Sequence, residues 1–168
     1  MRPAAIRLFP DPVLRQEAAP VKSFDASLLR LIHLLDATLR KQTHGIGIAA
    51  PQIGMGTSLA LVDVSSRVEG AERLILINPV IVEVQQERVS REGCMSLPDY
   101  TAQVKRYNWV RVVWKDEMGR SREKISVGIE AVCVQHEVDH LNGILFLDRV
   151  VSLKRDMIPR PRLRKSRS

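Results

Sequence analysis

The feature that most constrains this chain is a pair of histidines four residues apart in an apolar stretch near its C-terminal end. Residues 136–140 read His-Glu-Val-Asp-His, and they lie in a run, 129–142, that is predicted to be helical and to stop at Gly143. Residues four apart stack on one face of a helix, so both imidazoles can reach one metal ion. Glu137 projects away from that face, beside the position of a metal-bound water. The pattern therefore predicts a metal-binding helix with Glu137 as general acid and base.

Two histidines leave a metal site incomplete, so a third ligand must come from elsewhere in the chain. Zinc proteases with this helix motif take it from a third histidine six residues further on, or from a downstream glutamate. Phe146 stands at the first of these positions, and no glutamate follows Glu137. Asp148 and Asp156 are weak candidates, which turns the search to the two cysteines.

The two cysteines differ in their distance from the histidine pair. Cys133 precedes His136 by one helical turn, but it lies about 10.5 Å along the axis from His140, beyond the reach of an ion held between the imidazoles. We expect Cys133 to line a pocket near the metal or to fill the core. Cys94 lies in a glycine-bearing bend, residues 92–96, that could swing a thiolate toward the helix. Cys94 is therefore the favoured ligand, with an ordinary buried thiol as the alternative.

A glycine-rich segment, residues 45–50, formally matches the G-x-G-x-x-A pattern of dinucleotide-binding loops. It follows a predicted helix and a polar stretch instead of a strand, and Pro51 would disturb any helix that it opened. We interpret it as a surface of close approach, where missing side chains let another backbone lie alongside. Gln52 would supply an amide donor beside that surface, unless it is an exposed loop residue.

The remaining pattern predicts one further helix and a group of strands between the two helices. An extended arm over 3–20 precedes a helix over 25–42, for which Asp25 is the N-cap and leucines recur at helical spacing. A hairpin turn is expected at 116–119. The predicted strands are 59–63, 74–78, 80–84, 104–115 and 121–127. This order predicts an α+β fold in which antiparallel β-sheets surround a central metal-binding helix.

Composition predicts a single soluble domain. The chain has 168 residues, 45% of them apolar, which is enough for a core. No apolar run approaches the ~18–20 residues that a membrane-spanning helix needs, and the N-terminal residues do not form a secretory signal. Two cysteines are too few to staple a secreted domain. We therefore expect a cytoplasmic protein with no membrane partner.

The positive charge is concentrated at the C-terminal end. Residues 154–168 contain seven Lys or Arg and one Asp, so they carry six of the seven net positive charges. This predicts a catalytic domain over 1–153 and a basic tail over 154–168. Pro159 and Pro161 argue against a continuous helix in the tail. The tail is interpreted as a solvated terminus or as a contact to RNA or another polyanion. We expect no DNA partner, because no basic stripe precedes residue 153.

Three segments, in this order, resemble the signature motifs of bacterial peptide deformylases. They read Gly-Ile-Gly-Ile-Ala-Ala-Pro-Gln at 45–52, Glu-Gly-Cys-Met-Ser at 92–96 and Gln-His-Glu-Val-Asp-His at 135–140. The resemblance covers residues 5–155 and includes the Asn78-Pro79 step and Arg106. It implies a peptide deformylase-like fold and a hydrolase that removes the formyl group from the N-terminal formyl-methionine of new polypeptides, releasing formate.

The resemblance also implies a cofactor and a set of site residues. A labile Fe(II), replaceable by nickel, cobalt or zinc, would be held by Cys94, His136 and His140, in agreement with the elimination above. Glu137 would be the general acid and base, and the Gln52 side chain and the Met95 backbone N–H would stabilise the oxyanion. The implied substrate contacts are Gly45, Ile46, Gly47, Gly93, Ile129, Val132 and Cys133. Of these, Ile46, Ile129, Val132 and Cys133 would line the methionine pocket, and Ile46 and Gly93 would pair with the substrate backbone.

Two departures from the family pattern affect the expected partners. Thr101 stands where better-known relatives carry an arginine. Pro159 and Pro161 interrupt the C-terminal element through which family members often dock the ribosome, although its charge remains, so ribosome contact through the tail is an expectation.

Two other functions compete with this interpretation. One is a small zinc endopeptidase, and the other is a basic RNA-binding accessory protein with a structural metal. A structural zinc site normally has four protein ligands, and only three are credible here, which favours catalysis.

Overall fold

The structure, a computed structural model, describes residues 2–160 as an α+β fold built around one antiparallel sheet. Five strands follow one another in space in the order β1-β2-β3-β4-β5, and β6 pairs with β4. Their bounds are Gly47–Ala49 for β1, Leu59–Val62 for β2, Leu74–Cys94 for β3, Leu97–Lys115 for β4, Ser121–Val127 for β5 and Met157–Pro159 for β6. The predicted fold class is confirmed.

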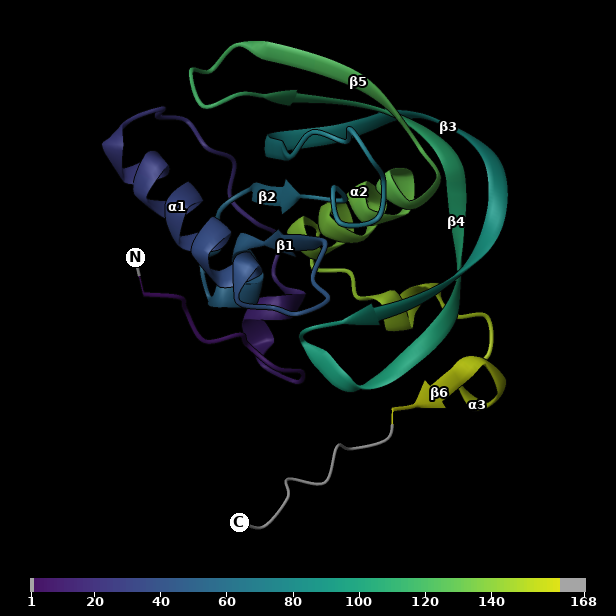
Figure 1. Ribbon diagram of the computed structural model, residues 1–168. Helices are drawn as coiled ribbons and strands as arrows, with labels where there is room; N and C mark the ends of the chain where they lie inside the picture. Colours follow the sequence, from purple (N-terminus) through teal and green to yellow (C-terminus); the bar gives the residue numbers. More distant parts are fainter. Residues whose placement is uncertain (1, 161–168) are drawn as a thin grey trace.

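The two long strands give the sheet its shape. β3 and β4 run 21 and 19 residues and curve around the second helix (Figure 1). β5 pairs with the C-terminal half of β4, from Trp109 to Lys115, and β6 pairs with its N-terminal part, from Tyr100 to Ala102. Register shifts interrupt the β3–β4 ladder at three places, the last beside Cys94. The curved sheet therefore brings the end of β3 back toward the helix that it encloses.

The strand prediction was too short at this point. The sequence pattern places strands at 80–84 and 104–115, whereas β3 continues to Cys94 and β4 begins at Leu97. Residues 85–89 of β3 are exposed, so the apolar alternation that identifies a half-buried strand is missing there. Pairing with β4 holds this stretch extended, which is a tertiary effect.

Helix α1, Ala26–Arg40, agrees with the prediction for 25–42. The Asp25 side chain accepts the backbone N–H groups of Ser27 and Leu28, as an N-cap residue does. Leucine and isoleucine side chains on one face of α1 pack against β1, β2 and the turn that follows β1. This packing covers the outer side of the glycine-rich segment.

Helix α2, Gly128–Leu141, is the centre of the molecule (Figure 1). Eleven of its fourteen residues are buried, because β1 to β5 surround it. It ends in a Schellman motif: Gly143 N–H donates to the His140 carbonyl at 3.2 Å, and Ile144 N–H donates to the Asp139 carbonyl at 2.9 Å. Gly143 has φ +69°, and a Cβ there would lie 2.6 Å from the Arg15 carbonyl oxygen. The predicted stop at Gly143 is therefore confirmed.

The chain ends pack against this framework. The N-terminal arm contains a 3₁₀ turn, Pro12–Arg15, and the Asn78 side chain bonds both the N–H and the carbonyl of Val21. Two further 3₁₀ turns are Ala50–Ile53 and Phe146–Arg149.

The C-terminal segment begins with folded elements. Residues 153–159 form a helical turn, α3 at Leu153–Asp156, and strand β6, neither of which the sequence pattern predicts. The remainder of the expected basic tail, residues 161–168, lies outside the described residues. Within residues 2–160, no helix has both the length and the apolar character needed to cross a lipid bilayer.

Candidate metal centre

One cysteine and two histidines meet where the end of β3 touches α2. The Cys94 sulfur and one ring nitrogen from each of His136 and His140 all lie within 4.8 Å of one another. The Cys94 Sγ is 3.2 Å from His140 Nε2, and the two imidazole centroids are 4.9 Å apart. Cys94, which precedes His136 by 42 residues in the sequence, thus completes the three-residue cluster that the elimination favoured.

The chemistry of this cluster fits a divalent transition metal. Burial opposes ionisation of the Cys94 thiol, but the neighbouring imidazoles outweigh it, so the pKa of Cys94 falls well below its usual value. A thiolate and two neutral imidazoles are ligands that such metals favour, and three ligands leave a coordination position open. The His136 Nδ1 bonds the Glu92 carboxylate at 2.8 Å, which turns its Nε2 toward the centre. Cys94, His136 and His140 therefore fit the divalent metal that the sequence predicts.

The other ligand candidates are held elsewhere. Asp148 pairs with Arg15 and accepts the Leu145 N–H, and Asp156 pairs with Arg155. Cys133 points at the Ile46 carbonyl, to which its thiol donates at 3.3 Å. Burial raises the pKa of Cys133 well above its usual value, so the thiol stays neutral.

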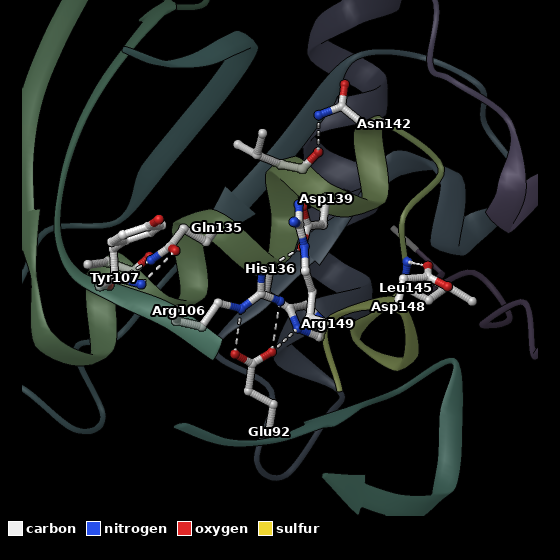
Figure 2. A network of polar contacts seen from close by, with 12 residues as sticks. Glu92, Arg106, Tyr107, Gln135, His136, Asp139, Asn142, Leu145, Asp148 and Arg149 are labelled. Atoms are coloured by element: carbon white, nitrogen blue, oxygen red, sulfur yellow. Dashed lines mark hydrogen bonds and ion pairs between the residues drawn. The ribbon is translucent and has the colours of Figure 1, made fainter. Parts of the chain in front are cut away.

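A buried ion network holds His136 in place (Figure 2). Arg106, which is 3% exposed, donates from Nε to one Glu92 oxygen at 2.7 Å and from Nη2 to the other at 3.1 Å. Its Nη1 donates to Asp139 on α2, which also accepts Arg149 Nη2 at 2.7 Å. Burial raises the pKa of Glu92, but hydrogen bonds from His136 and Arg106 outweigh this and lower it to about 2. The charged carboxylate therefore orients the ring.

Glu137 lies beside the cluster with a free carboxylate oxygen. It is 3% exposed, and its Oε2 finds no hydrogen-bond donor among residues 2–160. Burial raises the pKa of Glu137 to about 7, which makes proton uptake and release both accessible near neutral pH. A Cβ on Gly47 would lie 2.9 Å from the Glu137 carboxyl carbon and 2.6 Å from Cys133 Sγ. Gly47 is thus a point of close approach, although side chains of α2, and not another backbone, lie against it.

Gln52 reaches the centre from the 3₁₀ turn that follows β1. It is 1% exposed, which excludes the interpretation as an exposed loop residue. Its Oε1 accepts the Ala49 N–H at 2.9 Å, so the amide is held with Nε2 toward Ser96 Oγ, at 3.2 Å, and Cys94 Sγ, at 3.5 Å. The chain thereby places a fixed amide donor beside the cluster.

A cavity of about 750 Å³ opens onto these groups. The site residues that the sequence and the resemblance predicted line it, apart from His140, the third member of the cluster, which is buried. The lining includes Gly45, Ile46, Gly47, Gln52, Gly93, Cys94, Met95, Ile129, Val132, Cys133, His136 and Glu137.

Sequence reasoning missed the groups that support the cluster. Asp139 occupies a variable position inside the His-Glu-x-x-His motif, and the local sequence assigns no role to Glu92, Arg106 or Arg149. One signal was available: an acid inside an apolar helix needs a buried cation, because an unpaired buried charge is costly.

The His-Glu-x-x-His helix, the cysteine sulfur beside its two imidazoles and the buried glutamate on the same cavity are the arrangement of a metal-dependent hydrolase. The family model described as Polypeptide deformylase matches residues 3–156. A peptide deformylase of Rhizobium meliloti (strain 1021) is 44% identical over 154 residues, which cover 91% of this chain and 88% of the relative. The chain therefore belongs to the polypeptide deformylase family, whose metal-dependent members remove the N-formyl group from the methionine of nascent peptides.

Solved structures agree with this assignment. A peptide deformylase from Legionella pneumophila superposes with a TM-score of 0.85 at 38% identity, covering 92% of this chain and 89% of that one. A class I type b peptide deformylase from Acinetobacter baumannii with Met-Ala-Ser bound gives 0.83 at 32% identity, covering 89% of this chain and 99% of that one.

Proposed function

We propose that this protein carries out the family's reaction with Cys94, His136 and His140 as metal ligands and Glu137 as general acid and base. The observation that carries the proposal is the Cys94 sulfur beside the two imidazoles of α2. On the same cavity lies the buried Glu137 carboxylate, whose Oε2 has no hydrogen-bond donor among residues 2–160. Fe(II) is the metal that we propose for the cell, with zinc, nickel or cobalt as replacements, because a thiolate and two imidazoles suit several ions.

The bound metal would lower the pKa of the attacking water and polarise the formyl carbonyl. Glu137 accepts a proton from the water while the water oxygen forms a bond with the formyl carbon. Gln52 Nε2 and the Met95 N–H donate to the developing oxyanion. Glu137 then passes its proton to the departing amine as the C–N bond breaks, which leaves formate and a free methionine N-terminus.

We expect the methionine side chain to lie against apolar residues of the cavity. Ile46, Ile129, Val132 and Cys133 line it, and the neutral Cys133 thiol adds no charge. The substrate backbone would lie extended between Ile46 and Gly93. The relative that binds Met-Ala-Ser supports a peptide with an N-terminal methionine as the ligand here.

The experiment compares formate release from formyl-Met-Ala-Ser by anaerobically purified wild type and Glu137→Gln, with metal analysis of the same samples. We expect the variant to keep its metal and to turn over at least about 10²-fold more slowly. Glu123→Gln, on the exposed strand β5, is the control and should match the wild type. Full turnover by Glu137→Gln would contradict the proton-transfer role, and internal cleavage of denatured protein without formate release would indicate an endopeptidase.

We also propose a cytoplasmic location and a ribosome contact through the basic residues that follow β6. The support is the charge of residues 154–168 and the nascent peptide as substrate. A full-length variant with Arg162, Arg164, Lys165 and Arg167 changed to Ser should lose co-sedimentation with ribosomes at low salt. Equal sedimentation of variant and wild type would end this proposal.

A further inference from the structure

The C-terminal strand contributes an arginine to the cavity described above. β6 pairs with Tyr100–Ala102 of β4, and the Arg160 N–H donates to the Asp99 carbonyl at 2.7 Å, which continues the pairing by one residue. The Arg160 side chain lines the same cavity as Cys94 and Glu137. A residue of the C-terminal segment, which lies outside the family's three motifs, therefore reaches the site.

Arg160 lies directly over Gly93. A Cβ placed on Gly93 would be 2.8 Å from the Arg160 Cζ and 3.3 Å from the Thr101 Cγ2. The guanidinium thus occupies the volume that any side chain at position 93 would fill. Because Gly93 is a proposed backbone contact of the substrate, the guanidinium lies next to the path of the bound peptide.

A second arginine flanks Gly93 on the same face. Arg91 is two residues before Gly93 on β3, so both residues project to one side of the sheet. The Arg91 Nε donates to the Thr101 hydroxyl at 3.2 Å. Gly93 is the register partner of Thr101, which places Arg91, Thr101 and Arg160 around the exposed Gly93.

These two guanidiniums differ from the other arginines near the site in their partners. Arg106 and Arg149 are held by buried carboxylates. Over residues 2–160, neither Arg91 nor Arg160 has a carboxylate within ion-pair distance. Arg67 and Arg88 line the cavity too, so its exposed charge is positive. A surface of this kind attracts an anion from outside.

We infer that Arg160 and Arg91 form a carboxylate-binding subsite, through which the enzyme prefers formyl-methionyl peptides with Asp or Glu among the residues that follow the methionine. The inference rests on the proposed function and deepens it. The planar guanidinium fork binds a carboxylate through two parallel hydrogen bonds, which a neutral side chain cannot match. An extended substrate at Gly93 alternates its side chains, so one of them projects to the side of these arginines.

The experiment measures kcat and KM of the metal-loaded, full-length protein on formyl-Met-X-Y amides in which X or Y is Asp, Asn or Lys. We expect kcat/KM for the best Asp peptide to exceed that of its Asn twin by about three- to ten-fold at low salt, through KM. The ratio should shrink between about 50 mM and about 500 mM NaCl, since salt screens exposed charges.

The variants separate this subsite from a general effect of charge. Arg160→Ala should bring the Asp-to-Asn ratio to within about two-fold, Arg160→Lys should retain part of it, and Arg91→Ala should lower it. Arg155→Ala is the matched control, because its guanidinium pairs with Asp156 in the same segment and does not line the cavity. It should keep the wild-type ratio.

A second readout does not depend on turnover. The unformylated product amides should inhibit competitively. In Arg160→Ala the Asp product should lose affinity by the factor by which the Asp-to-Asn ratio of kcat/KM falls. Three results would each overturn the inference. They are an equal Asp-to-Asn ratio in wild type and Arg160→Ala, a wild type with no preference for acidic peptides, and a change in kcat/KM on Arg160→Ala that is the same for all peptides. Failure of the proposed function is distinct, because formate would then be released from none of the peptides, including the neutral ones.

Discussion

Replacing Arg106 with Ala should remove a large share of this protein's stability. The side chain is 3% exposed and donates to both oxygens of Glu92 and to Asp139. Its loss would leave two carboxylates buried without their shared cation. Glu92 would keep only the bond from His136, and Asp139 would keep only Arg149.

The expected loss of unfolding free energy depends on these remaining partners. Removing one member of a buried ion pair costs about 3–5 kcal/mol, because the other charge stays desolvated. Both carboxylates retain one partner, which places the expected loss at the lower end, about 3 kcal/mol. With a urea m-value of about 2 kcal/mol per M, the unfolding midpoint should fall by about 1.5 M.

The assay is urea unfolding at pH 7 with wild type and variant at the same protein and metal concentrations, since metal binding adds to apparent stability. Arg111→Ala is the control: Arg111 pairs with Glu83 and Glu123 at the exposed surface, and its loss should cost less than about 1 kcal/mol. Replacing all three groups, as Arg106→Met with Glu92→Gln and Asp139→Asn, should cost less than Arg106→Ala alone. A midpoint for Arg106→Ala equal to that of Arg111→Ala would refute the reasoning.

Three further changes have definite outcomes. Gly47→Ala should lower kcat/KM by about 10²-fold, because the added carbon would lie 2.6 Å from Cys133 Sγ and displace the side chains of Cys133 and Glu137. Unchanged steady-state kinetics would contradict this. Cys94→Ser should lose bound metal in elemental analysis, since it removes the thiolate, and full occupancy would exclude Cys94 as a ligand. Burial raises the pKa of Asp116, but hydrogen bonds from Arg120 outweigh this and lower it to about 2, so its carboxylate stabilises the fold above the unfolded pKa of about 4 and that contribution is lost as pH falls toward 2. Asp116→Asn should therefore be less stable than wild type at pH 6 in urea unfolding, with a smaller difference at pH 3; a constant difference would contradict the assignment.

Local signals predicted α1, α2 and the hairpin turn between β4 and β5. The N-cap at Asp25, the stop at Gly143 and the hairpin turn at 116–119 each depend on a few neighbouring residues. The length of β3 was missed because residues 85–89 are exposed and lack apolar alternation. β6 was missed for a related reason: a three-residue strand beside a proline carries little local preference, and its pairing with β4 is what forms it.

The site divides in the same way. The two histidines and Glu137 could be assigned from their spacing, and Cys94 could be favoured by eliminating the alternatives. The partners of these groups could not be assigned, because Glu92 and Asp139 look like any other acids until burial beside Arg106 is known.

The sequence by itself determined a metal-binding helix, the glutamate beside it, the stop at Gly143 and the resemblance to a family of deformylases, because all of these lie within short stretches of chain. Only the tertiary structure decided that the Cys94 sulfur lies 3.2 Å from His140, that Arg106 bridges two strands and a helix, and that Arg160 covers Gly93. These contacts join segments far apart in sequence, and they form where the curved sheet closes around α2, so no local pattern carries them.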